Sequence, residues 1–200
     1  MVGTIVYNGF WNPDTPPDPV RRLIAAADRR GEVLRPLPNT ALSVCLDDQA
    51  RVAGWQGDYA LFWDKDTRLA RGLEAAGIRV CNPAAAIEVC DDKAACQLAL
   101  TGHGLPLPRT LVAPMTYRSI DGGIESFCRQ AEAAFSYPMV VKECYGSFGG
   151  QVTLVSSGEE LRALCRTMDA RPFLVQEFVS TAAGEDYRCL LYTSTRNSPA

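Results

Sequence analysis

Short apolar segments alternate with amphipathic helical segments over residues 1–85. Four segments have the β-branched, aromatic or continuous apolar character of strands: residues 4–7, 32–37, 59–63 and 78–81. Helical patterns lie between them at residues 19–30, where Pro19 suits a first turn, and at residues 67–76, which end at Gly77. Because each helix carries the chain back across the sheet, this alternation predicts an α/β fold with a parallel, layered sheet.

A charged turn follows the most apolar of these strands. Asp64, Lys65 and Asp66 come directly after residues 59–63, "YALFW". Parallel sheets bind ligands beyond the carboxyl ends of their strands, so this turn lies at a candidate substrate edge. A solvated surface turn is the simpler interpretation, and we prefer it.

The composition is that of a globular protein, with 47% hydrophobic and 22% charged residues in a chain of 200. This length suggests one or two domains. The net charge of −3 gives no sign of the basic surface that binds nucleic acid or an anionic membrane. No apolar run approaches the roughly 18 residues of a membrane span. Residues 1–10 lack the charged region and cleavage site of a signal peptide, so we expect a cytoplasmic protein.

Eight cysteines are scattered along the chain without a C-x-x-C pair, and His103 is the only histidine. Disulfide frameworks belong to small secreted chains, and zinc sites need closely spaced cysteine or histidine pairs. His103 lies in "TGHGLPLP", whose glycines and prolines indicate a turn. We therefore expect neither a disulfide framework nor a metal site, and no catalytic thiol or histidine.

A lysine and a glycine-rich loop lie between two strand patterns in "VVKECYGSFGGQVTLV", residues 140–155. A P-loop places its lysine after the glycines and opens a helix, and a dinucleotide fingerprint also requires a following helix. Here Lys142 precedes the loop, and residues 151–155 have a strand pattern. The segment is therefore neither motif, and it predicts two antiparallel strands joined by a glycine-rich flap.

Such a flap can cover a triphosphate. Gly146, Gly149 and Gly150 permit a positive φ and a close approach of the backbone. The amides of Ser147 and Phe148 could then donate to phosphate oxygens, and the lysine on the preceding strand would add a positive charge. An ordinary glycine hairpin is the preferred interpretation of this segment taken alone.

A second lysine lies at the start of a predicted helix in "CDDKAACQLALTGHG". Asp91 is the expected N-cap, and Gly102 ends the pattern. Lys93 then falls in the first turn, where the helix dipole favours anions rather than cations. A phosphate bound by free N–H groups at this terminus would explain the lysine. A solvated lysine is the alternative.

The strand pattern "FLVQEFV", residues 173–179, contains a polar pair inside an apolar run. An adenine site needs backbone N–H and C=O groups beside an apolar wall. Glu177 could accept a hydrogen bond from the exocyclic amine, while Phe178 and Val179 offer their backbone. In "GEDYR", Asp186 could bind ribose hydroxyls and Arg188 a phosphate or carboxylate.

The order of these segments resembles that of the ATP-grasp ligases, and most closely the RimK-type group. The segments are "DDK", "GLPLPRT", "PMVVKE", "GSFGGQV", "VQEFV" and "GEDYR". The resemblance covers residues 59–188 well and residues 1–58 by architecture only. It implies an N-terminal Rossmann-like pre-ATP-grasp domain at 1–90 and the first part of an ATP-grasp domain at 91–188.

The resemblance also implies an activity. The family joins a carboxylate to the amine of an amino acid, with ATP and Mg²⁺, through an acyl phosphate. Lys93 and Lys142 would bind the nucleotide phosphates, and Gly146–Gly150 would form the flap. Gln176–Val179 would form the adenine hinge, with Asp186 as a further nucleotide contact and Arg188 as the candidate catalytic residue. Replacing Lys142 by alanine should then weaken ATP binding and hardly change fold stability.

The end of the chain departs from the family pattern. ATP-grasp enzymes hold Mg²⁺ with late acidic residues and an asparagine, whereas "CLLYTSTRNSPA" after Arg188 contains no carboxylate side chain. We expect the metal ligands to be missing and the 200-residue chain to be an inactive fragment. "CLLYTS" also matches the translation of a transposon end used in sequencing libraries, so residues 189–200 are expected to be non-native. A continuing strand is the alternative.

Two other functions stay open on the sequence. One is a non-catalytic nucleotide-binding module, which would share the flap and the hinge. The other is an α/β protein that binds a small molecule or a partner and whose glycine loop is only a hairpin. Protection of Lys142 by ATP from chemical labelling would argue against the second. The identities of the amino acid and its acceptor, and any homo-oligomer, are left open as well.

Overall fold

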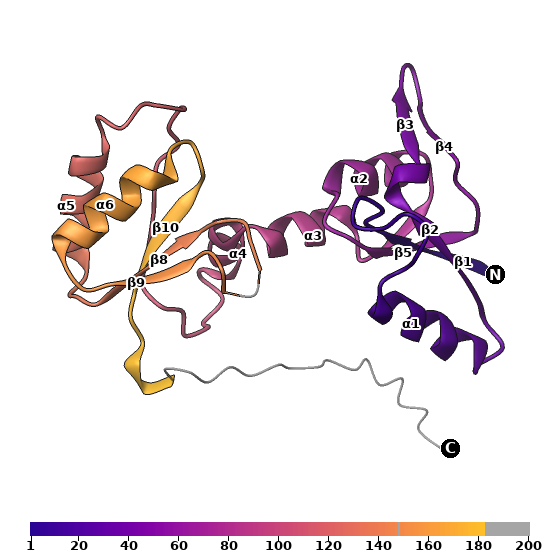
Figure 1. The fold of residues 1–200 in the computed structure, drawn as a ribbon, viewed down its shortest axis with the longest axis horizontal. Helices are drawn as coiled ribbons and strands as arrows, with labels where there is room; N and C mark the ends of the chain where they lie inside the picture. Colours follow the sequence, from indigo (N-terminus) through magenta and orange to yellow (C-terminus); the bar gives the residue numbers. More distant parts are fainter. Residues whose placement is uncertain (148, 183–200) are drawn as a thin grey trace. The chain divides into compact units, whose positions relative to one another are not determined.

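The computed structural model describes residues 1–147 and 149–182, which form two compact units (Figure 1). The first unit contains Met1–Leu105 together with the loop Cys144–Gly150. The second contains Pro106–Glu143 and residues 151–182. Each unit has its own hydrophobic core, as independently packed domains do.

A four-stranded parallel sheet forms the centre of the first unit. In spatial order its strands are β2 (Val33–Pro38), β1 (Val2–Tyr7), β5 (Tyr59–Trp63) and β6 (Arg79–Cys81). β1 pairs in parallel with β2 on one side and with β5 on the other. The strand order therefore reverses between β1 and β5, and open α/β sheets bind ligands beyond the carboxyl ends of such strands. The predicted parallel sheet is confirmed.

Helices cover both faces of this sheet. α1 (Asp18–Asp28) packs against the face that carries Ile5 and Tyr7, whereas α2 (Thr67–Ala75) packs against the face that carries Val6. Successive side chains of a strand point to opposite faces, so β1 contributes to both cores. This double burial explains the nearly continuous apolar sequence of the strand.

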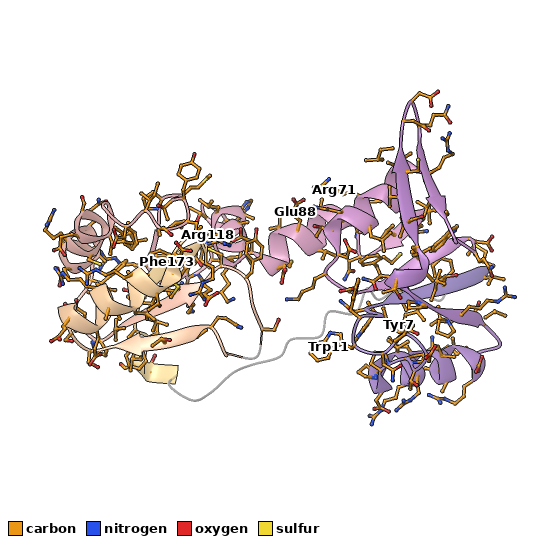
Figure 2. The ribbon with its side chains drawn as sticks, turned by 45° about the horizontal axis from the view of Figure 1, so that its top comes forward. Tyr7, Trp11, Arg71, Glu88, Arg118 and Phe173 are labelled. Atoms are coloured by element: carbon orange, nitrogen blue, oxygen red, sulfur yellow. The ribbon has the colours of Figure 1, made fainter. Side chains whose placement is uncertain are left out.

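A hairpin and further short helices complete the unit. The hairpin strands β3 (Ser43–Leu46) and β4 (Ala50–Ala53) are antiparallel, and the sequence analysis did not predict them. Their link to α2 depends on Gly72, because a Cβ there would lie 2.6 Å from a methyl group of Val44. η1 (Asn39–Ala41) follows β2, and α3 (Ala84–Asp91) and α4 (Lys93–Leu100) follow β6. Figure 2 shows Arg71 of α2 beside Glu88 of α3, with which it forms an ion pair.

An antiparallel sheet covered on one face by two helices forms the second unit. The strand order is β7 (Thr110–Val112), β10 (Phe173–Glu177), β8 (Met139–Glu143) and β9 (Val152–Val155). The helices are α5 (Ile124–Ala134) and α6 (Gly158–Met168). Alternate residues of β8 and β10, among them Val141 and Phe173, pack into the helix-side core. Phe173 makes an edge-to-face contact with Phe127 of α5, with 5.3 Å between ring centroids.

A polar cluster joins the two helices of this unit. Arg162 of α6 donates two hydrogen bonds to Glu132 of α5, both 2.9 Å long, and two to Glu125, 2.9 and 3.1 Å long. These hydrogen bonds lower the pKa of both carboxyl groups. The Tyr137 hydroxyl also donates to Glu132, and burial, with this bond, raises the pKa of Tyr137 to about 12. The cluster fixes the helix pair against the sheet.

The predicted elements agree with the structure within a few residues, with two corrections. Asp91 is the last residue of α3, and Asp92 is the N-cap of α4, so the predicted N-cap is wrong by one position. The strand predicted to extend to Val179 ends at Glu177. Within residues 1–147 and 149–182, no helix is both long and apolar enough to cross a membrane.

Candidate functional site

The glycine-rich segment joins two antiparallel strands, as predicted. β8 and β9 pair with Lys142 opposite Val152, and the Glu143 N–H donates to the Gln151 carbonyl at 3.0 Å. Gly146 has φ 127° and Gly149 has φ 73°, backbone conformations that residues other than glycine rarely adopt.

Gly150 departs from the expectation for this loop. It does not have a positive φ. A Cβ at Gly150 would approach only the Ser147 carbonyl oxygen, at 4.0 Å, and one at Gly149 would meet no atom within 4 Å. Among the described residues, neither the backbone conformation nor a close contact requires glycine at position 150.

The N–H groups at the start of α4 are already satisfied. The Asp92 carboxylate accepts from the N–H groups of Ala94, at 2.8 Å, and Ala95, at 3.1 Å. The Lys93 N–H donates to the carbonyl of Cys144 at 2.9 Å. The expectation that free N–H groups at this terminus hold a phosphate is therefore wrong, and the lysine side chain is the donor left to consider.

The Lys93 side chain is partly buried and points at the glycine-rich loop. Its ammonium donates to the carbonyl of Gly146 at 3.1 Å and to that of Cys144 at 3.4 Å. Lys93 is thus not a solvated surface lysine. It brings a positive charge to the backbone of the loop that the family resemblance implies to be a phosphate flap.

Lys65 also contacts this loop, which the sequence analysis missed. Its ammonium forms an ion pair with Asp91 and donates to the Ser147 hydroxyl at 2.9 Å. The neighbouring Asp66 is the N-cap of α2, accepting from Leu69 at 3.1 Å. Lys65 is exposed, as expected for a solvated turn, and it also contacts the glycine-rich loop, which that interpretation did not include. The only signal for Lys65 in the sequence was its position directly after a parallel strand.

Lys142, in the second unit, belongs to a chain of side-chain hydrogen bonds. The Lys142 ammonium donates to the Gln176 side-chain oxygen at 2.6 Å, and the Gln176 amide donates to the Thr110 hydroxyl at 2.8 Å. Gln176 is only 7% exposed. These side chains lie on the sheet face opposite α5 and α6, where Val152 and Leu154 of β9 are exposed. The face therefore combines a fixed positive charge with apolar surface.

The predicted adenine hinge lies at the end of β10. The Glu177 N–H donates to the Arg109 carbonyl at 3.0 Å, and the Arg109 N–H donates to the Glu177 carboxylate at 2.8 Å. Glu177 is therefore already a hydrogen-bond acceptor within the protein. Phe178 and Val179 follow the last strand residue, so their backbone groups lie beyond the sheet ladder.

A pocket of about 430 Å³ adjoins this hinge. Its lining residues come from the start of β7, the turn before β8 and the end of β10: Arg109, Phe135, Ser136, Tyr137, Pro138, Glu177, Phe178 and Ser180. The Arg109 guanidinium lies 5.2 Å from the centroid of the Phe135 ring and donates to the Ala134 carbonyl at 2.7 Å. Arg109 is thus held in place beside the hinge.

Comparison with known families identifies the segment that carries these features. A model of the RimK-like ATP-grasp domain matches residues 90–194, slightly more than half of the chain. The chain belongs to the RimK-like ATP-grasp family. The fold class predicted from the sequence, α/β with an ATP-grasp architecture, is confirmed.

Individual relatives agree with this membership. An uncharacterized protein, the MG012 homolog of Mycoplasma pneumoniae, is 33% identical over 135 residues, which are 66% of this chain and 46% of that protein. Beta-citrylglutamate synthase B of Danio rerio is 35% identical over 131 residues, which are 64% of this chain and 30% of that protein. The crystal structure of a RimK domain ATP-grasp protein from Sphaerobacter thermophilus superposes with a TM-score of 0.68 at 24% identity. The superposition covers 89% of this chain and 64% of that one. The chain thus spans less than half the length of these two curated relatives.

Some residues that the RimK-like family implies lie outside the described part of the chain. Phe148 of the loop, Asp186 and Arg188 are among them, so their predicted roles stay predictions. Within residues 1–147 and 149–182, no three histidine, cysteine, aspartate or glutamate side chains form a group that could hold a metal ion.

Proposed function

We propose that the protein is an ATP-dependent carboxylate–amine ligase of RimK type, which forms an amide or peptide bond. The observation that carries this proposal is the glycine-rich hairpin together with two lysines that adjoin it. Lys142 lies on its leading strand, and Lys93 donates to its loop carbonyls. The family membership and the name of the Danio rerio relative support ligase chemistry.

Lys93 and Lys142 are assigned to the nucleotide phosphates. The Lys93 ammonium donates to loop carbonyls, and the Lys142 ammonium donates to the Gln176 amide oxygen. Phosphate oxygens are stronger acceptors, because hydrogen bonds between ionised groups are shorter and roughly twice as strong. On ATP binding, Lys93 would exchange the carbonyl of Gly146 for a phosphate. The loop amides could then turn toward the same anion.

The end of β10 is assigned to adenine. The backbone N–H and C=O groups of Phe178 and Val179 would hydrogen-bond the edge of the adenine ring, because they lie beyond the paired part of the strand. Gln176 positions Lys142 and does not itself contact the base in this assignment. Asp186 is proposed to bind the ribose, and Arg188 to be the catalytic residue that stabilises the reacting carboxylate.

The proposed reaction has two steps. A substrate carboxylate oxygen attacks the γ-phosphorus of ATP, the bond to the β-phosphate oxygen breaks, and an acyl phosphate and ADP result. The amine of an amino acid then attacks the acyl carbon, phosphate leaves, and the amine loses a proton to give the amide. The two lysines lower the cost of the charge that accumulates on the transferred phosphoryl group. Mg²⁺ would supply further neutralisation, but no described residue is assigned to hold it.

We also propose that the enzyme works in the cytoplasm. The described cysteines are all free thiols, which fits a reducing compartment. Those that are buried, such as Cys165, behave as small apolar residues in the core.

The test is ADP release by the complete gene product, measured against a panel of amino acids, with and without small carboxylates. We expect release that requires both a carboxylate and an amine, with one new amide per ADP. ATP binding without amino-acid-dependent ADP release would favour the second candidate, a non-catalytic nucleotide-binding module. A protein that binds no ATP would contradict both.

A further inference from the structure

A pocket of about 370 Å³ lies in the first unit, in a part of the chain that the proposed nucleotide site does not use. Its lining comes from the end of β5 and the loop between β1 and α1: Asn8, Trp11, Asn12, Thr15, Pro17 and Trp63. Trp63 is the last residue of β5 and pairs with Tyr7, the last residue of β1. The pocket therefore lies where the strand order of the parallel sheet reverses, the position at which such sheets bind small molecules.

Exposed tryptophans form the walls of this pocket. Trp11 is 91% exposed and Trp63 is 47% exposed. Figure 2 shows Trp11 projecting outward from the loop, whereas Tyr7 is directed into the unit. Large aromatic side chains left in water on a concave surface mark binding sites, because a ligand can cover them.

The loop that carries Trp11 is held by hydrogen bonds on both sides of that residue. The Tyr7 hydroxyl donates to the Pro13 carbonyl at 2.9 Å, and the Gly9 N–H donates to the buried Asn39 side chain at 2.9 Å. The Asn12 side-chain oxygen accepts from the N–H groups of the second and third residues after it, both at 3.1 Å. The backbone of the loop is therefore held in place by the protein itself, which reduces the entropic cost of binding.

The charges around the pocket favour a positive ligand. None of its six lining residues, all in the described part of the chain, is charged. Asp64 lies outside the lining but hydrogen-bonds the Asn8 amide and accepts from Asn39 at 3.2 Å. Asp14 lies on the loop itself. The arginines at the start of α1, Arg21 and Arg22, pair with Asp18 at 3.2 and 2.6 Å.

We propose that this pocket binds an organic cation, an ammonium group carried on a ring or a short apolar stem. Indole faces attract cations through their quadrupole, and they bind quaternary and primary ammonium groups in this way. An anionic ligand would instead meet carboxylates and no basic lining residue. If the pocket is a subsite for a cationic group of the amine substrate, its role rests on the proposed ligase function. The proposal that the pocket binds an organic cation is independent of that function.

The test uses three probes of similar size and different charge on the 200-residue chain without ATP: benzyltrimethylammonium, benzyl alcohol and benzoate. Binding is followed by calorimetry and by tryptophan fluorescence. We expect affinity in the order cation, neutral, anion, with benzoate at least about tenfold weaker than the ammonium probe. Equal or tighter binding of benzoate, or no binding of the ammonium probe up to about 50 mM, would overturn the proposal.

Substitutions of the two pocket tryptophans test whether the ammonium probe binds in this pocket. Trp11→Ala and Trp63→Ala should each weaken the ammonium probe about tenfold. Trp11 is so exposed that its loss leaves the melting temperature unchanged. Trp55→Phe is the matched control, because Trp55 packs with the α2-side core and donates to the Gly57 carbonyl. Unchanged affinity in both pocket variants would place the probe elsewhere and overturn the proposal. Because no ATP is present, a failure here is distinguishable from a failure of the ligase assignment.

Discussion

Replacing Lys142 by methionine should weaken both ATP binding and the fold. The substitution keeps the apolar stem and removes the ammonium that donates to Gln176 at 2.6 Å. Gln176 is 7% exposed, so its side-chain oxygen loses a donor that water cannot readily replace. A buried acceptor left in this state costs about 1–3 kcal/mol in the free energy of unfolding. The structure thus changes the sequence-based expectation that fold stability would hardly respond.

The effect on nucleotide binding has a separate origin. If Lys142 holds a phosphate, the variant loses one charge-assisted hydrogen bond, worth about 1.5–3 kcal/mol, so the dissociation constant for ATP rises about 10- to 150-fold. Urea unfolding followed by circular dichroism measures stability, and titration calorimetry measures ATP affinity. Glu143→Gln is the control on the same strand, because Glu143 pairs with the exposed Arg171 instead.

A double variant separates the two effects. Lys142→Met combined with Gln176→Leu leaves no unpaired glutamine oxygen, although the Thr110 hydroxyl loses the hydrogen bond from Gln176. Part of the lost stability should therefore return while ATP affinity stays low. Unaltered ATP affinity in Lys142→Met would refute the placement of this lysine at the nucleotide. Unaltered stability would refute the inferred cost of the unpaired glutamine.

Three further outcomes are expected from the loop and the helix pair. Gly149→Val should impair both ATP binding and the order of the loop, because φ is 73° at this position, whereas Gly150→Val should impair ATP binding alone. Hydrogen exchange of the loop without ATP measures its order, and equal effects of the two variants on that exchange would contradict this difference. Lys65→Met should speed hydrogen exchange at residues 144–147, since it removes the bond to the loop serine. The pKa values of the two glutamates bonded to Arg162 are lowered in the folded state, so their contribution is present above about pH 4.3 and is lost as the pH falls through the folded values. The melting temperature should therefore fall on acidification, and Arg162→Met should flatten that dependence; an unchanged pH profile in the variant would argue against the cluster.

The parallel sheet and the glycine hairpin could be predicted because their signals are local. β1 and β5 are short apolar runs bounded by polar turns, and Lys142 stands between an apolar run and glycines. The β3–β4 hairpin gives no such signal. Its strands have four residues each, and most of their side chains face solvent, with Val44 and Val52 as the packed exceptions. Its position depends on packing against α2, which is a tertiary effect.

Other features depended on contacts between distant residues. Two adjacent aspartates precede α4, and either could cap it by residue type. Asp91 is instead part of α3 and pairs with Lys65, which leaves Asp92 as the cap. The bond from Lys65 to Ser147 joins residues 82 apart in sequence, so no local pattern indicates it.

The chain contains only three lysines, Lys65, Lys93 and Lys142, which makes the central claim directly testable. An ATP analogue with an acyl group on its terminal phosphate acylates the lysines that lie beside bound phosphates, and peptide mass spectrometry locates the modification. We expect acylation of Lys93 and Lys142 that excess ATP suppresses, and weaker acylation of Lys65, whose ammonium is paired with Asp91. Acylation of Lys65 alone, or acylation that ATP does not suppress, would contradict the assignment of this glycine hairpin to a nucleotide.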